Sequence, residues 1–219
     1  MKHIRNLALP LFAALFIVSS CGTPKPTASA PKAGKSGSGL SEQEQINATY
    51  AFFDAQKEKV SGNDQRALEL FAQCLRIDTK NHAAMYEMAS IYNAKGKVND
   101  ALFFAKSASD LDPKNEWYQL LLANTYEKSG KFTEAISIYQ QLYKKYPDRV
   151  EYLFSESDAL LMQGKLQEAI KVYDVIEKEI GVTREMTQQK QRLYLKMGKV
   201  NEAAGELEKL IQSDPDNMD

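Results

Sequence analysis

Apolar residues recur three and four positions apart along most of this chain, in stretches separated by short polar segments. In residues 115–129, for example, Leu122, Ala123 and Tyr126 fall on one side of a helix. This periodicity predicts an all-α fold. The expected helices are ten, over residues 42–60, 64–77, 82–95, 98–111, 115–129, 132–145, 149–163, 166–179, 184–197 and 200–212.

Polar residues, glycines and prolines mark where these helices begin and end. Ser41 and Glu44 have the spacing of a capping box, so the first helix is expected to start there. Gly130 follows the last periodic residue of its helix, where glycine readily adopts the left-handed conformation that ends a helix. Thr133 is expected to cap the next helix. Pro147 stops that helix, because proline disfavours helical geometry in the residue before it.

A glycine followed five residues later by an alanine recurs at a fixed interval of 34 residues. Fixed spacing over five copies is the signature of a repeat array. Two helices cannot bury their apolar faces alone, so neighbouring pairs are expected to stack into a continuous core, with the small alanine where the second helix of each pair crosses the first. The copies begin at Gly62, Gly96, Gly130, Gly164 and Gly198, and their alanines are Ala67, Ala101, Ala135, Ala169 and Ala203.

This pattern resembles the tetratricopeptide repeat family over about residues 48–217. The resemblance implies tandem helix-turn-helix repeats in a right-handed α-solenoid. Pro113, Pro147 and Pro215 stand at the inter-repeat proline of the family. The five expected repeats cover about residues 48–81, 82–115, 116–149, 150–183 and 184–217, within a repeat domain of residues 41–219.

Both end repeats depart from the family pattern. The first has Asp54 and Glu58 at two expected core positions. The last has Thr187, Lys190 and Gln191 where its first helix should be apolar or small, so that helix is expected to be weakly specified. End repeats are usually atypical.

The N-terminus has the pattern of a signal peptide. A basic start is followed by an apolar run, residues 7–18, too short to span a bilayer. The sequence Val18-Ser19-Ser20-Cys21 resembles the bacterial lipobox, which implies a signal peptide over residues 1–20 and lipidation of Cys21. Residues 21–40 are expected to be a disordered, lipid-anchored linker, because they lack aromatic and acidic residues. The alternative is a secreted protein cut elsewhere.

The resemblance to bacterial lipoproteins also implies a location in the cell envelope. Gly22 stands where enteric lipoproteins kept in the inner membrane have aspartate, and no acidic run follows Cys21 as in surface-exported lipoproteins of Bacteroides-like organisms. We therefore expect a lipid anchor in the outer membrane, facing the periplasm. In a Gram-positive cell the protein would lie on the outer face of the plasma membrane.

Composition excludes several functions. The formal net charge of −1 over 219 residues suggests no nucleic-acid partner. Two cysteines and two histidines are too few for a disulfide framework or a metal cluster. Cys74 is expected to be a small buried residue without an activating base, and His82 to be exposed. We expect no enzyme activity, no cofactor and no metal.

The C-terminal residues 214–217 repeat the pattern of residues 112–115, which introduces a new first helix. A capping helix is expected at the end of such an array, yet none follows. The chain is therefore interpreted as the N-terminal fragment of a longer protein, or as one whose end a partner covers. An apolar flank at Leu193, Leu207 and Leu210 predicts reversible self-association or fraying of residues 184–219.

Residues thirteen, ten and six before each repeat glycine share one helix face, opposite the core stripe. By resemblance this face lines the concave groove of the superhelix, where rings and amides suit an extended peptide. The alternative is that these rings only pack. The candidate groove residues are Phe52, Gln56, Tyr86, Ser90, Trp117, Leu120, Asn124, Phe154 and Asp158.

Three functional hypotheses follow. The first is a non-catalytic envelope scaffold that binds a protein or an extended peptide in this groove. The second is a carbohydrate- or peptidoglycan-binding module, and the third is an interaction arm of a longer envelope protein. The two-carboxylate clamp of chaperone-binding family members is not expected, because its positions hold Phe52, Gln56, Glu87, Trp117 and Leu121.

Overall fold

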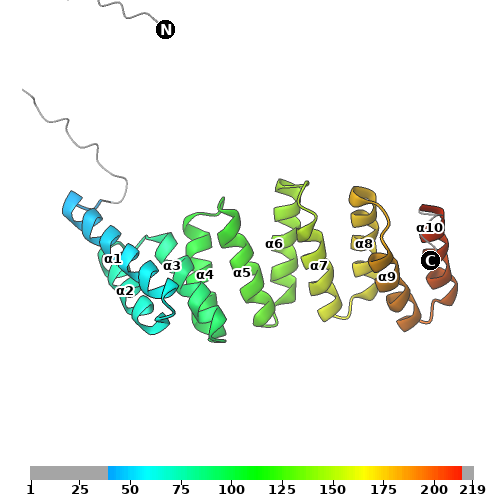
Figure 1. The fold of residues 1–219 in the computed structure, drawn as a ribbon, viewed down its shortest axis with the longest axis horizontal. Coiled ribbons are helices and arrows are strands. Elements are labelled where there is room, and N and C mark those ends of the chain that lie inside the picture. The colour runs from blue at the N-terminus through cyan, green and yellow to red at the C-terminus, as the bar shows by residue number, and fades with distance from the viewer. Residues whose placement is uncertain (1–38, 214–219) are drawn as a thin grey trace, which may run out of the picture. The chain divides into compact units, whose positions relative to one another are not determined.

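The computed structural model describes residues 39–213, which fold into ten α-helices without a β-strand (Figure 1). The prediction of an all-α fold is confirmed, and each helix begins and ends within two residues of its expected bounds. The helices are α1 (Glu42–Val60), α2 (Asp64–Ile77), α3 (His82–Ala94), α4 (Val98–Leu111), α5 (Glu116–Lys128), α6 (Phe132–Lys145), α7 (Glu151–Met162), α8 (Leu166–Ile180), α9 (Arg184–Lys196) and α10 (Val200–Ser213).

Local signals account for most helix ends. The Ser41 hydroxyl accepts from the Glu44 amide, while the Glu44 carboxylate accepts from the Ser41 amide at 2.9 Å, so the predicted capping box is present. Gly130 has a φ of 73°, and the amide after it bonds back to Tyr126 O at 2.8 Å. The prediction that Thr133 caps α6 is wrong. The helix starts one residue earlier, and the Thr133 hydroxyl instead accepts from Gln163 at 2.8 Å.

The helices form pairs, and the pairs follow one another in a row (Figure 1). Each odd-numbered helix packs against the even-numbered helix that follows it, and each even-numbered helix packs against the next odd-numbered one. We call the odd-numbered helices first helices and the even-numbered ones second helices. The first helix α3 also contacts the first helix α5 directly.

The repeat alanines lie where the helices of a pair cross. Ala67, Ala101, Ala135 and Ala169 have no exposed surface, and Ala203 is 4% exposed. Larger side chains fill the space between pairs, and Phe71, Tyr139 and Tyr152 are among the largest fully buried ones. The repeating core expected from the 34-residue pattern is therefore present.

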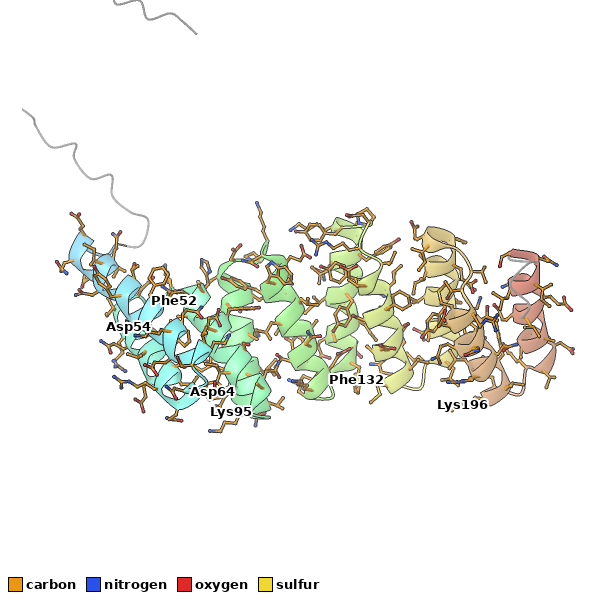
Figure 2. All side chains as sticks on the ribbon, in the orientation of Figure 1. Phe52, Asp54, Asp64, Lys95, Phe132 and Lys196 are labelled. Carbon is orange, nitrogen blue, oxygen red and sulfur yellow. The ribbon has the colours of Figure 1, made fainter. Side chains whose placement is uncertain are left out.

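The first repeat replaces its missing core residues with a neighbouring ring. Asp54 is exposed, and Glu58 is half-buried and accepts from Asn63 at 2.7 Å. The rings of Phe52 and Phe71 pack edge to face, with ring centroids 5.6 Å apart. Asp54, labelled beside Phe52 in Figure 2, is exposed on the same helix. This contact agrees with the alternative interpretation of Phe52, in which its ring packs in the core.

The last repeat corrects two expectations. Helix α9 is complete, and Lys190 anchors it as a fully buried side chain, so the lysine does not weaken the helix. Leu193 is buried at 8% exposure and does not belong to the apolar flank. That flank consists of Leu207, which is 47% exposed, Leu210, which is half-buried, and Ile211, which is 40% exposed.

No helix in the described part of the chain is long and apolar enough to cross a bilayer. The predicted signal peptide, Cys21 and nearly all of the linker lie outside the described residues, as do Pro215 and the start of the sixth repeat.

Candidate partner-binding site

All nine candidate groove residues lie on first helices. Residues three or four positions apart share a helix face, so each set points the same way on its own helix. We call this surface the first-helix face. It carries Phe52 and Gln56 on α1, Tyr86 and Ser90 on α3, Trp117, Leu120 and Asn124 on α5, and Phe154 and Asp158 on α7.

Side chains link successive first helices to one another. Gln56 on α1 donates to Glu87 on α3 at 2.8 Å, and Asn93 on α3 donates to Thr125 on α5 at 3.0 Å. These hydrogen bonds hold the first-helix face in place. The Gln56 amide was expected to suit an extended peptide, but any bond to a partner's backbone would compete with its bond to Glu87.

Further links join α5 to α7. Arg149, which precedes α7, forms an ion pair with Glu116 on α5, and the Tyr152 hydroxyl donates to the same carboxylate. An ion pair of 3.0 Å between Asp64 and Lys95 likewise joins the start of α2 to the end of α3, where the two labels stand close together in Figure 2. The array from α1 to α7 therefore presents a braced surface.

Tyr86 belongs to an aromatic group between α3 and α5. Its ring lies 5.1 Å from that of Tyr118, and the Tyr118 hydroxyl is 2.9 Å from His82 Nδ1. Burial, and then Asp112, raises the pKa of Tyr118. His82 is half-buried, so the expectation that it is exposed is wrong. Tyr86 is half-buried as well and presents only part of its ring to solvent.

Trp117 is the most exposed ring among the candidate residues. It is 59% exposed at the start of α5, where its backbone amide donates to Asn115 Oδ1 at 3.1 Å. Leu120, one turn further on, is half-buried against the cluster around Tyr139, and Phe154 on α7 is half-buried against the neighbouring cluster. The middle of the first-helix face therefore combines an exposed ring with two partly open apolar side chains.

The polar end of the same stripe is acidic. Asn124 Oδ1 accepts from the buried Tyr139 hydroxyl at 2.9 Å, and Glu127 also lies within hydrogen-bonding reach of that hydroxyl. Burial raises the pKa of Glu127; the Tyr139 bond opposes this, and the charge of Asp158 adds to it. Burial also raises the pKa of Asp158. The charges of the half-buried Glu127 and the exposed Asp158 therefore act on each other beside the Tyr139 hydroxyl.

Sequence reasoning missed Glu127 and Tyr139. A signal for Glu127 was available, since it follows Asn124 by three residues and continues the same face. Tyr139 gave no such signal, because it belongs to a second helix and reaches this face only through the packing of α6 against α5.

The chemically reactive side chains of residues 39–213 are not grouped into a catalytic or metal site. Cys74 has no exposed surface, and burial, followed by the charge of Asp78, raises the pKa of its thiol to about 11. A nucleophilic cysteine needs a lowered pKa, so Cys74 packs as a small apolar residue, as expected. Within residues 39–213 no three His, Cys, Asp or Glu side chains are grouped to hold a metal ion.

The paired helices define a helical-repeat solenoid, and the comparisons identify its class. Three family models described as tetratricopeptide repeat match residues 61–125, 120–180 and 192–217. Together they cover more than half of the chain, which belongs to the tetratricopeptide repeat family. No curated protein sequence matches it significantly.

Solved structures share this fold. MamA from AMB-1 is 19% identical with a TM-score of 0.62, over 78% of this chain and 94% of that one. YrrB, described as a TPR protein with an unusual peptide-binding site, is 19% identical with a TM-score of 0.64, over 81% and 91%. MamA from Desulfovibrio magneticus RS-1 is 13% identical with a TM-score of 0.63, over 79% and 98%. At these identities the similarity shows the fold alone.

Proposed function

We propose that this protein is a non-catalytic scaffold that binds a protein or an extended peptide along its first-helix face. The observation that carries the proposal is Trp117, a large ring 59% exposed on a surface that side-chain bonds hold in place. Exposed aromatic side chains beside partly open apolar ones are typical of binding hot spots. Leu120 and Phe154 supply those neighbours.

Family and fold support the same class of function. Repeat solenoids create extended surfaces suited to long ligands. YrrB, which shares the fold, is described as having a peptide-binding site. A braced surface also lowers the ordering cost of binding, because the receptor side is already arranged.

The test begins with a partner found by cross-linking in intact cells and then produced in pure form. Tyr86→Ala and Trp117→Ala are each expected to weaken its affinity, Trp117→Ala by about 2 kcal/mol, as for truncated aromatic hot spots. Phe103→Ala is the matched control, because this ring is 66% exposed but lies on the second helix α4. Equal affinity of all three variants and the wild type would place the binding surface elsewhere.

We also propose that the protein is anchored in the bacterial cell envelope through a lipid on Cys21, in the outer membrane facing the periplasm. The support is the sequence Val18-Ser19-Ser20-Cys21 after a short apolar run. Intact-mass analysis should find a mature chain that begins at a lipidated Cys21, and Cys21→Ala should release the protein from membranes. An unmodified mature N-terminus contradicts this proposal.

Self-association through the last repeat is a further proposal. The support is the exposed stripe of Ala204, Leu207 and Ile211 on α10, at positions that the other second helices bury or half-bury. Light scattering should show mass increasing with concentration, and Leu207→Glu should abolish the increase. A wild-type chain that stays monomeric at every concentration contradicts it.

A further inference from the structure

We propose that the partner bound on the first-helix face presents a lysine or arginine side chain to Glu127 and Asp158, next to apolar side chains that contact Trp117, Leu120 and Phe154. We call Glu127 and Asp158 the acidic pair. This inference rests on the proposed function and specifies the chemistry of its ligand.

Three helices bring the acidic pair together. Glu127 ends the stripe of α5 that begins with Trp117, Asp158 lies one turn after Phe154 on α7, and α6 packs against both helices. From α6 comes Tyr139, fully buried, whose hydroxyl donates to Asn124 and lies near both carboxylates. The arrangement runs from apolar at Trp117 to acidic at Glu127 along one helix face.

Several other acids of the array have a cation as partner, whereas the remaining buried or half-buried acids of the first helices, Glu58 and Glu156, accept from the amides of Asn63 and Gln140. Glu87 has Lys59, Glu116 has Arg149, and in the last repeat three carboxylates share Lys190. Within residues 39–213 no lysine or arginine nitrogen lies within 4.0 Å of either member of the pair.

The cations closest along the chain do not neutralise the pair. Lys128 follows Glu127 but donates to the carbonyl of Asn93 on α3 at 3.2 Å. Arg192 occupies on α9 the repeat position that Asp158 occupies on α7, yet it makes no ion pair with Asp158. The negative charge therefore stays uncompensated in this part of the face.

A basic side chain of the partner supplies the positive charge that the acidic pair lacks. Glu127 is half-buried, Asp158 is exposed and neither has a cation partner, so the two ionised carboxylates, whose pKa values burial raises, gain from a nearby positive charge. The alkyl stem of lysine or arginine packs on apolar surface while its head stays polar, so one residue can contact Leu120 or Phe154 and the acidic pair together. An acidic residue at the same place is repelled, which gives selectivity.

The test uses defined probes. These are short, end-blocked peptides of leucine, phenylalanine and serine with one central lysine, and otherwise identical peptides with central glutamine or glutamate. Fluorescence anisotropy with the full chain should give the tightest binding for lysine, weaker binding for glutamine and the weakest for glutamate. The preference for lysine should fall as salt is added, because screening weakens partly exposed charge pairs.

Matched variants test whether the acidic pair causes the preference for lysine. Glu127→Gln and Asp158→Asn keep the side-chain size, and each should weaken lysine-peptide binding about tenfold while leaving the glutamine peptide unchanged. Glu134→Gln and Asp110→Asn are controls, because both acids are exposed on second helices. The unfolding temperature of Glu127→Gln and Asp158→Asn should stay the same or rise, since each removes one of two like charges that act on each other, and this separates lost binding from lost folding.

The outcomes separate this inference from the proposed function. If peptides bind equally well whatever the central residue, and binding is lost only in Trp117→Ala, the proposed function stands and the acidic pair has no role. If binding is unaffected by Trp117→Ala and by both acid variants, the first-helix face is not the binding site and both proposals fail. A lysine preference that only the acid variants abolish supports this inference.

Discussion

The junction between α2 and α3 and the junction between α8 and α9 use the same position of the repeat with opposite chemistry. Eight residues before the repeat glycine, α3 carries Met88 and α9 carries Lys190, and both side chains are buried. Met88 lies in an apolar cluster with Phe71 and Cys74 of α2.

Lys190 lies among charges instead. Its ammonium is 2.7 Å from Asp174 and 2.9 Å from Glu177, both on α8, and 2.7 Å from Glu206 on α10. Glu206 also accepts from Lys209 at 2.9 Å. One buried cation therefore joins three helices, whereas Met88 joins its neighbours only by filling volume.

The fourth repeat shows an intermediate case. Glu156 on α7 occupies the same position, is 7% exposed and accepts from Gln140 at 2.7 Å. Burial raises the pKa of Glu156, and the bond from Gln140 opposes this. The repeat thus accepts an apolar, an acidic or a basic residue at one position, provided that the facing helix supplies matching chemistry.

The apolar and the charged junction are expected to respond differently to mutation. Besides Glu206 Oε2, whose ion pair with Lys190 spans 2.7 Å, the charged junction contains two buried oxygens, Glu177 Oε1 and Thr187 Oγ1, that have no hydrogen-bond partner among the described residues. Apolar packing degrades gradually when a methyl group is lost, but a buried charge network fails when one member is removed. The last repeat is therefore expected to depend on Lys190 more sharply than the second depends on Met88.

The largest expected effect is that of Lys190→Met. It leaves three carboxylates without their shared cation, and removing one partner of a buried ion pair typically costs about 3–5 kcal/mol. Denaturant unfolding measures the loss, and hydrogen exchange should show that it is concentrated in α9 and α10. If exchange in these helices is as slow as in the wild type, the cluster does not hold the last repeat.

Met88→Ala is expected to cost less, about 2 kcal/mol, through lost burial and a residual cavity. Met162→Ala is the matched control, because that side chain is 70% exposed and should change stability very little. Urea unfolding of both variants gives the comparison. A Met88→Ala loss equal to that of Lys190→Met would mean that the two junctions do not differ as proposed.

The sequence predicted the elements of each repeat but not the side-chain contacts between helices. Fixed spacing located Gly130, its buried partner Ala135 and every helix, because these depend on residues a few positions apart. Lys190 was interpreted as a flaw, since its three partners lie on two other helices. Their acidic character was visible, but only the packing shows that Asp174, Glu177 and Glu206 face one lysine.

The same distinction between local pattern and contacts between helices applies to the candidate site. Helical periodicity predicted that Trp117, Leu120 and Asn124 share one side of a helix, and all three lie at that spacing on α5. It did not show that Gln56 is already bonded to Glu87, nor that Tyr139 brings the acidic pair together. Contacts of this kind join residues about thirty positions apart or come from a different helix of the pair, so no local pattern reports them.

Alkaline pH offers a milder way to test the charged junction. Burial lowers the pKa of Lys190, but the bonds from Asp174, Glu206 and Glu177 outweigh burial and raise it above its ordinary value. A raised pKa stabilises the folded state fully below the unfolded value of about 10.4, and the contribution then declines by about 1.4 kcal/mol per pH unit as pH rises toward the folded value.

The measurable quantity is the difference in free energy of unfolding between wild type and Lys190→Met. This difference should be constant from pH 7 to about 10 and should shrink above it. Subtracting the variant removes the titration of groups that do not interact with Lys190; Tyr194, whose pKa the charge of Lys190 lowers, is an exception. A constant difference across the alkaline range would mean that the charge of Lys190 contributes nothing beyond its packing.

The smallest expected effect is that of Lys209→Met, which tests whether burial, rather than pairing itself, makes the cluster strong. Lys209 contacts the same carboxylate as Lys190, Glu206, but its side chain is 51% exposed. An exposed ion pair is worth about 0.2–1 kcal/mol because solvent screens it, so the loss should stay below about 1 kcal/mol and diminish with added salt. Denaturant unfolding at low and high salt measures both. A loss close to that of Lys190→Met would show that Glu206 depends on both lysines, and the contrast between the charged and the apolar junction would then reflect the number of charges and not their burial.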